Sequence, residues 1–397
     1  MNSEDIRKLE DLYVADTYAR YDVVIARGAG VRCYDPEGKE YLDFTSGIGV
    51  NALGFCEPGW VRAVTEQAGK LQHTSNLFYT SPCSLAAEKM IRLSGMSNMF
   101  FCNSGAEANE GAIKTARKYS QLKYGTGDGG EPFDRYEIIT LDGSFHGRTM
   151  ATITATGQES FHKDFSPFLQ GFAYAKANDA DDLRAKLSDR TCAVMIEFVQ
   201  GEGGVNDLDP AYVRTIADIC ATKDILLIAD EVQTGVARTG EFMAYDHFDV
   251  KPDIVTAAKG MGGGLPIGAI LFGERTKDVL KHGDHGSTYG GNPVVCAGAD
   301  YVLSKIDGAF LSNVRKNGAY IKERLLAMDG VSDVSGKGLM IGAALADKKA
   351  GDVVRACIKN GLLILTAKDK LRLLPPLIIR RDEIDAGLDI LERALKG

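Results

Sequence analysis

The sequence lacks the cysteine clusters that would indicate a metal site or a disulfide framework. Its eight cysteines stand singly, with no CxxC pair and no Cys/His cluster. Such cysteines are usually buried, reduced thiols of a cytosolic protein. The chain opens on Met1-Asn-Ser-Glu-Asp-Ile6, which is acidic where a secretory signal is basic. We therefore expect a cytoplasmic protein without a bound metal.

Long apolar runs and an excess of positive charge are also missing. No run approaches the roughly 18 residues of a membrane span, so no membrane partner is expected. The formal net charge is −8, which argues against a general nucleic-acid binder. A small anionic substrate stays possible, because a local basic pocket can lie in an acidic protein.

What is present is an alternation of apolar strands and helices. A chain of 397 residues should divide into two domains. The alternation favours the α/β class, with a mostly parallel sheet wrapped by helices. Strands are predicted at 99–101, 137–141, 192–196, 225–229, 254–256 and 269–272, and helices at 106–122, 179–187 and 210–222.

The two ends of the chain have a different pattern. An amphipathic helix is predicted over 1–20, before a small antiparallel meander with strands at 23–26, 31–34 and 41–44. The C-terminal part reads as a small α+β domain. We expect an N-terminal segment (1–50) that joins the small domain, a large domain (51–297) and the small domain (298–397). Further helices are predicted at 58–72, 84–93, 350–360 and 382–396, further strands at 331–334, 339–345, 362–365 and 371–374, and a surface loop at 125–130.

Two predicted strands each end in a charged residue close to glycine. Residues 225–229 lead into Asp230, and residues 253–258 lead into Lys259. Open α/β sheets bind ligands at the carboxyl ends of their strands, so this carboxylate and amine could hold one ligand between them. A structural salt bridge at the sheet edge is the alternative.

The Asp230 and Lys259 pair suits one kind of chemistry well. A lysine forms an imine with an aldehyde, and a carboxylate can keep a pyridine nitrogen protonated. At about 4 Å and an effective dielectric near 20, Coulomb's law gives about 4 kcal/mol, or roughly three pK units. The resulting pyridinium is the electron sink of pyridoxal phosphate chemistry.

Four further stretches have both a functional and an ordinary explanation. Residues 103–110 end a strand and begin a helix. The free N–H groups at the helix start could bind an anion such as phosphate, or the Asn or Ser side chain there could simply cap the helix. Residues 144–149 hold an aromatic ring, a histidine and an arginine, which could bind a ring and a carboxylate or form a surface loop. Residues 196–204 place a carboxylate in a glycine turn. Ser287 and Thr288 could complete a phosphate site or belong only to a turn.

Together and in this order, these stretches resemble the class III (ω-type) aminotransferases of fold type I. The likeness covers almost the whole chain, from Thr17 to Pro376. It implies pyridoxal 5′-phosphate (PLP) as cofactor, a large domain with a mostly parallel sheet, a small α+β domain and a homodimer with active sites at the interface. It is carried by SGAEANE (104–110), SFHGRT (144–149), QGEGG (200–204), DEVQTG (230–235), AAKGMGGGLP (257–266) and HGSTYGGNP (285–293).

The resemblance implies a cofactor role for each matching residue. Lys259 would hold the cofactor aldehyde covalently and later carry a proton between substrate and cofactor. Asp230 would pair with the pyridine nitrogen. Gln233 would bind the ring hydroxyl, with Phe145 and Val232 on the two ring faces. The phosphate would be held by Ser104, Gly105, Ala106 and, from the neighbouring subunit, Thr288.

Two arginines would bind substrate carboxylates, because the guanidinium fork matches a carboxylate. Arg148 would take the carboxylate far from the reacting amine. Arg372 would take the α-carboxylate of glutamate, and Glu202 would mask it while the other substrate is bound. The remaining substrate-side residues are Ile48, whose apolar side chain fits an acylated α-amine, Tyr18 and Ser287.

The activity implied is transamination of N2-acetyl-L-ornithine with 2-oxoglutarate, giving N-acetylglutamate 5-semialdehyde and glutamate, as in arginine biosynthesis. Another ω-amine donor (4-aminobutyrate, succinylornithine or ornithine), an aminomutase or racemase, and a non-catalytic sheet protein are the alternatives. The Arg372–Glu202 pair argues against a mutase, which has no glutamate half-reaction. The sequence departs from the family pattern at Phe55 and Glu57, where histidines are usual, and at Phe198, where proline is usual.

Overall fold

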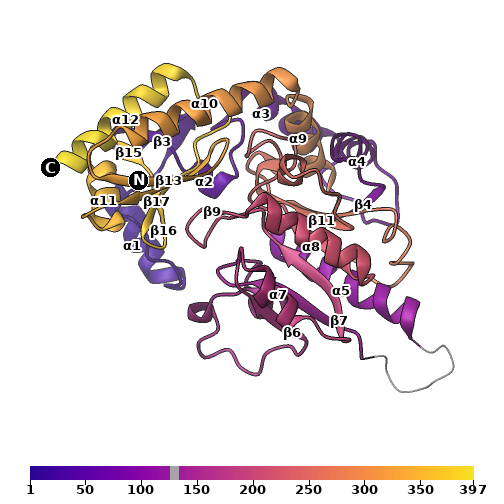
Figure 1. Cartoon of the computed structure of the whole chain (residues 1–397). Helices are drawn as coiled ribbons and strands as arrows, with labels where there is room; N and C mark the ends of the chain where they lie inside the picture. The colour runs from indigo at the N-terminus through magenta and orange to yellow at the C-terminus, as the bar shows by residue number, and fades with distance from the viewer. Residues whose placement is uncertain (126–133) are drawn as a thin grey trace.

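A computed structural model of the chain describes residues 1–125 and 134–397. The described residues form a large central sheet of seven strands (Figure 1). The five strands from β11 to β6 are parallel, while β12 is antiparallel to both of its neighbours. The α/β class and the mostly parallel sheet predicted from the sequence are confirmed. The strand order is β4 (Asn98–Cys102), β12 (Gly268–Phe272), β11 (Ile254–Ala257), β10 (Leu226–Asp230), β7 (Thr191–Ile196), β5 (Glu137–Leu141) and β6 (Phe172–Ala175).

Helices cover both faces of this sheet, which explains why its strands are continuously apolar. Every residue of β7, β10, β11 and β12 is buried. Neighbouring residues of one strand enter different cores: Ile138 packs with Ile113 of α5, and Ile139 packs in the cluster that contains Ile216 of α8. The helices of this part are α3 (Pro58–Lys70), α4 (Ser81–Ser94), α5 (Gly105–Tyr124), α6 (Met150–Ala155), α7 (Ala180–Lys186), α8 (Pro210–Thr222) and α9 (Pro293–Ser304).

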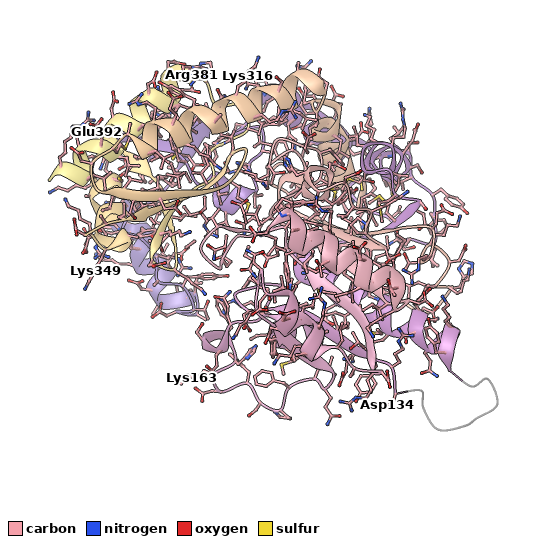
Figure 2. The ribbon with its side chains drawn as sticks, viewed as in Figure 1. Asp134, Lys163, Lys316, Lys349, Arg381 and Glu392 are labelled. Carbon is pink, nitrogen blue, oxygen red and sulfur yellow. The ribbon has the colours of Figure 1, made fainter. Side chains whose placement is uncertain are left out.

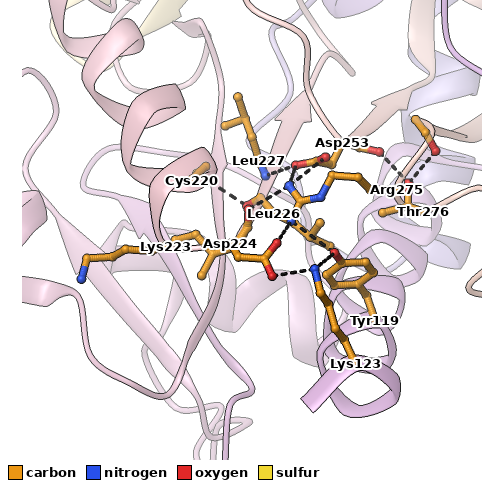
Figure 3. A network of polar contacts seen from close by, with 12 residues as sticks. Tyr119, Lys123, Cys220, Lys223, Asp224, Leu226, Leu227, Asp253, Arg275 and Thr276 are labelled. Carbon is orange, nitrogen blue, oxygen red and sulfur yellow. Dashed lines mark hydrogen bonds and ion pairs between the residues drawn. The ribbon is translucent and has the colours of Figure 1, made fainter.

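A network of ion pairs fixes the amino ends of β10 and β11 (Figure 3). Arg275 binds Asp224, just before β10, at 2.7 Å and Asp253, just before β11, at 3.1 Å. Asp253 also accepts a hydrogen bond from Leu227 N at 2.9 Å. Both strands are therefore anchored at the edge opposite to their carboxyl ends.

The N-terminal and C-terminal segments of the chain lie side by side and share one β-sheet (Figure 1). The strand β15 adds in parallel to the antiparallel meander β1–β2–β3, with Leu362 opposite Leu42. A second, antiparallel sheet has the order β13, β14, β17, β16. The bounds are α1 (Ser3–Tyr13), β1 (Arg27–Ala29), β2 (Arg32–Tyr34), β3 (Glu40–Asp43), α2 (Ser46–Gly49), α10 (Gly308–Leu326), β13 (Val331–Lys337), β14 (Met340–Leu345), α11 (Ala350–Lys359), β15 (Leu362–Leu363), β16 (Leu365–Ala367), β17 (Lys370–Leu373) and α12 (Arg381–Lys396).

The outer faces of the C-terminal helices are charged. Figure 2 shows Lys316 of α10 and Arg381 and Glu392 of α12 on the outside of the molecule. Their inner faces carry apolar residues such as Ile321 and Leu388, which are fully buried. No helix of the described ranges is long and apolar enough to cross a membrane. Within those ranges no cluster of three or more His, Cys, Asp or Glu side chains could hold a metal ion.

The structure differs from the predicted elements in several places. The first helix ends at Tyr13 rather than near residue 20, because Val14 takes an extended backbone. The first strand of the meander is Arg27–Ala29 instead of 23–26, where only Ala26 N bonds across to Tyr34 O. The helices α9 and α10 and the short elements β6 and α6 were not predicted. Most of the loop predicted at 125–130 lies outside the described residues.

Candidate active site

A cavity of about 500 Å³ lies where the strands of the central sheet end. Its walls come from the segments that follow β4, β5, β7, β10 and β11, as expected for an open α/β sheet. Nine of the residues predicted from the sequence line it: Ser104, Gly105, Ala106, Phe145, Arg148, Asp230, Val232, Gln233 and Lys259.

Asp230, the last residue of β10, is buried and held by three neighbours. Its Oδ2 accepts a hydrogen bond from Asn109 Nδ2 at 2.8 Å and contacts His146 Nδ1 at 2.7 Å. Its Oδ1 accepts a hydrogen bond from Val232 N at 3.0 Å. Burial lowers the pKa of His146, but the hydrogen bond and the charge of Asp230 outweigh burial and leave that pKa raised. The carboxylate therefore has a fixed orientation, and its charge favours the protonated form of His146.

Lys259 reaches the same cavity from the end of β11. Its backbone is in the left-handed region, with φ of 43°, a strained conformation that is frequent at functional sites. Its amine has no hydrogen bond or ion pair with any residue that the structure describes, Asp230 included. Burial lowers the pKa of this amine, and the charge of Asp230 opposes that shift in part. Lys259 and Asp230 therefore do not form a salt bridge, and the Lys259 amine is available as a nucleophile.

Glu197 is a second buried carboxylate in the cavity wall. It accepts hydrogen bonds from Phe145 N at 2.9 Å and from Gly201 N at 3.3 Å. Burial raises the pKa of Glu197 to about 7, against the opposing charge of His146. The sequence analysis singled out the stretches that contain Glu197, His146 and Asn109 but gave none of these three residues a role of its own. Each of the three lies close after a predicted strand or near the start of a helix. That position was the one signal in the sequence that they could belong to the site.

The start of α5 forms one end of the cavity. Ser104 caps this helix, and its Oγ accepts a hydrogen bond from Glu107 N at 3.2 Å. The first N–H groups of a helix have no acceptor within it, so those of Gly105 and Ala106 can bind an anion. A Cβ atom at Gly105 would lie 2.6 Å from Val232 Cγ1. Only glycine lets the helix start come this close to Val232.

The loop with Ser287 and Thr288 lies beside this helix start. Ser287 Oγ accepts a hydrogen bond from Asn103 Nδ2 at 3.0 Å. Thr288 is exposed, and neither hydroxyl lines the cavity of its own chain.

The polar groups of the cavity fit PLP. Gln233 is buried, and its Oε1 has no hydrogen-bond partner among the described residues, which leaves an acceptor for a ring hydroxyl. Val232 and Phe145 both line the cavity and are apolar, as the two faces of a ring require. An anchored carboxylate, an unpaired amine and a helix start complete the set that a pyridine nitrogen, an aldehyde and a phosphate need.

Two arginines lie at or near this cavity. Arg148 is exposed in its wall, with its guanidinium carbon 4.4 Å from the centre of the Phe161 ring. It has no carboxylate partner within the described residues. Arg372 is buried and bonds Glu202 Oε1 at 2.6 Å. The charges of Arg372 and Glu202 both act on the Lys259 amine, although neither residue lines the cavity itself.

Ile48 and Tyr18 lie away from these groups. Ile48 is 39% exposed and has φ of 65°. Tyr18 is 71% exposed and lines a different cavity of about 520 Å³, with residues that include Ile358 and Leu365. Neither lines the main cavity in the single chain.

Comparison with known proteins gives a consistent set of relatives. Residues 13–395 match the family Aminotransferase class-III. The chain is 49% identical over 397 residues to an acetylornithine aminotransferase of Haemophilus ducreyi, covering 100% of this chain and 99% of that one. It is 47% identical to one of Caldanaerobacter subterraneus, covering 97% and 98%.

Solved structures agree with this result. The N-acetylornithine aminotransferase of Stenotrophomonas maltophilia matches with a TM-score of 0.84 and 36% identity, covering 98% of both chains. The ornithine aminotransferase of Toxoplasma gondii matches with a TM-score of 0.92 and 32% identity, covering 100% of this chain and 95% of that one. Class III aminotransferases use PLP, which the cavity fits. The chain belongs to the class III aminotransferases.

Proposed function

We propose that the protein transfers the ω-amino group of N2-acetyl-L-ornithine to 2-oxoglutarate, giving N-acetylglutamate 5-semialdehyde and glutamate. The observation that carries the reaction type is the cavity in which the unpaired Lys259 amine shares walls with the anchored Asp230. The choice of amino donor is supported by relatives named acetylornithine aminotransferase that are 41–49% identical over nearly the whole chain.

The cavity residues divide the work on the cofactor among them. Bound PLP supplies an electron sink that stabilises negative charge on the substrate carbon. Lys259 Nζ would hold the cofactor aldehyde and would carry the proton at the substrate carbon, a task for which its lowered pKa suits it. Asp230 would pair with the pyridine nitrogen, and Gln233 would bind the ring hydroxyl. Phe145 and Val232 hold the ring between them.

The phosphate is bound at the start of α5 and across a dimer interface. Ser104, Gly105 and Ala106 supply the helix-start donors, and the partner subunit's Thr288 supplies a hydroxyl. A homodimer is supported by large apolar side chains exposed beside this loop: Leu77 is 87% and Phe78 is 70% exposed.

Two arginines discriminate the substrates by their carboxylates. Arg148 binds the carboxylate far from the reacting amine in both substrates. Arg372 binds the α-carboxylate of glutamate, after Glu202 releases it. While Glu202 holds Arg372, the site accepts an amine with no adjacent carboxylate. The remaining substrate contacts belong to Ile48, Tyr18 and Ser287.

The domain division and the location in the cell are part of the same proposal. Residues 1–50 join residues 298–397 in the small domain, which the pairing of β3 with β15 supports, and 51–297 form the large domain. A cytoplasmic location is supported by the eight cysteines, all of which are free thiols.

A panel of amino donors under saturating 2-oxoglutarate tests the proposal. We expect N2-acetyl-L-ornithine to give the highest kcat/KM, well above ornithine, succinylornithine and 4-aminobutyrate. A higher value for free ornithine would refute the choice of donor and leave the reaction type intact. No glutamate formed from any donor would refute the reaction type.

A further inference from the structure

Arg238 is a charged side chain buried between the segment that follows β10 and the C-terminal sheet. It lies with Gln233 in the loop that directly follows Asp230, here called the Asp230 loop, and only 2% of its surface is exposed. Burying a guanidinium is unfavourable, and apolar residues of similar volume often pack at least as well. The charge at this position therefore points to a role beyond packing.

The guanidinium of Arg238 binds two separate places in the C-terminal sheet. Its Nη1 donates to the carbonyl oxygen of Leu339 at 3.0 Å and to that of Pro375 at 2.6 Å. Its own carbonyl oxygen accepts a hydrogen bond from Leu339 N at 3.0 Å. Arg238 Nε and Nη2 have no acceptor within the described residues, so Nη1 and the backbone make all of its bonds there.

These contacts lie at the ends of β17, the strand that carries Arg372, and of its neighbour β14. Leu339 directly precedes β14, and Pro375 closely follows β17. The two strands are antiparallel neighbours, with Gly342 opposite Arg372. Arg372 in turn bonds Glu202 and contacts Gly201 O at 3.4 Å. Arg238 thus connects the loop that directly follows Asp230 to the strand that carries Arg372.

We propose that Arg238 is a positioning residue that fixes the distance between the Asp230 loop and the substrate arginine Arg372. The inference rests on the proposed function, in which Arg372 binds glutamate but not the acylated donor. Removing the Nη1 contacts should let β14 and β17 shift relative to Asp230. A shift of about 1 Å at a binding group can cost up to about a hundredfold in rate. The loss should fall on glutamate and spare the acylated donor.

Single-turnover kinetics of the holoenzyme with each substrate test this role. For Arg238→Gln we expect the half-saturating glutamate concentration to rise about tenfold, and that of N2-acetyl-L-ornithine to change less than about twofold. Arg238→Lys keeps the charge and one donor group, so it should show a smaller rise for glutamate alone. Equal changes for both substrates, or no change, would overturn the positioning role. If Arg238→Gln does not fold, Arg238→Lys gives the same test: a rise for glutamate alone supports the positioning role, and equal changes for both substrates, or no change, overturn it.

A double-mutant cycle separates positioning from general stability. In an Arg372→Ala background, Arg238→Gln should have no further effect on glutamate. A full additional effect would show that Arg238 does not act through Arg372. The matched control is Arg275→Gln, which removes a partly buried arginine at the other end of the sheet and should leave the ratio of the two half-saturating concentrations unchanged. A wild-type protein inert toward glutamate would refute the proposed function as well, whereas equal shifts in an active enzyme refute only the role of Arg238.

Discussion

Asp230 combines a fixed position with a negative charge at the end of a buried strand. Asn109, His146 and the backbone of Val232 hold its two oxygens. In the proposed site, this arrangement would give the pyridine nitrogen one well-placed anion at a buried position. The charge, rather than the hydrogen-bonding capacity, is what the proposed reaction requires.

The variant Asp230→Asn should therefore lose activity while keeping its fold. An interaction of about 4 kcal/mol with the ring nitrogen corresponds to a fall in kcat of about a thousandfold. Steady-state kinetics of the PLP-loaded variant would measure it. Asp253→Asn, at the other end of the sheet, is the matched control and should lower stability with little effect on kcat. A decrease under tenfold for Asp230→Asn would contradict the assigned role.

Glu231, the neighbour of Asp230, makes a prediction about pH. Burial raises its pKa from 4.5 to about 7, although hydrogen bonds from Thr234 Oγ1 and the Tyr245 backbone oppose the shift. The folded protein then binds more protons than the unfolded chain between pH 4.5 and 7, so this group makes the free energy of unfolding fall as pH rises. Between pH 4.5 and 7, the free energy of unfolding of the wild type should fall by about 3 kcal/mol more than that of Glu231→Gln. Urea unfolding at several pH values would measure it, and parallel pH profiles would contradict it.

At the residue scale, the sequence was informative where the chemistry is unusual. Asp230 and Lys259 stood out because charged residues directly follow buried apolar runs. The contact of His146 with Asp230 joins residues 84 positions apart, and no local pattern indicates such a pairing. The roles of these residues in catalysis stay predictions.

At the scale of elements, the start of α5 depends on one glycine. Gly105→Ala would place a Cβ atom 2.6 Å from Val232 Cγ1, which must displace either the helix start or Val232. We expect PLP affinity to fall about tenfold or more, as measured by absorbance titration of the apoenzyme. Gly69→Ala in α3, where an added Cβ meets nothing within 4 Å, should leave affinity unchanged. Equal affinities for the two variants would contradict the close approach at Gly105.

The strands buried on both faces were predictable, whereas some other elements were not, including the long helices α9 and α10. Strands such as Thr191–Ile196 and the helix Pro210–Thr222 match their predictions closely, because burial on both faces leaves a continuous apolar run. The strand Phe172–Ala175 is only partly buried and has no such signal. Gly268–Phe272 was predicted as a strand, but its antiparallel direction depends on the path of the chain between strands rather than on its own residues.

At the scale of the whole molecule, the proposed site needs two chains. Thr288 is exposed, and its loop is tied to the exposed apolar segment through Asn76, whose Nδ2 donates to Ser287 O at 3.0 Å. We expect a dimer of the 42.8 kDa chain by light scattering. A monomer at micromolar concentration would contradict it.

Mixed dimers show whether Thr288 acts across the interface. Thr288→Ala should weaken PLP binding, and Lys259→Ala should abolish covalent attachment. A heterodimer of the two variants would then contain one site with both native residues, and half of its sites should regain wild-type affinity for PLP. No recovery in the mixed dimer would show that Thr288 acts within its own chain.

The most direct measurement of the central claim uses glutamate alone. The purified, PLP-loaded protein should lose its yellow absorbance on adding glutamate and release about one equivalent of 2-oxoglutarate per site, since amino transfer is completed in two separate halves. Lys259→Ala should show neither change at a comparable rate. An absorbance that glutamate leaves unchanged in the wild-type protein, with no 2-oxoglutarate released, would contradict the proposed aminotransferase reaction.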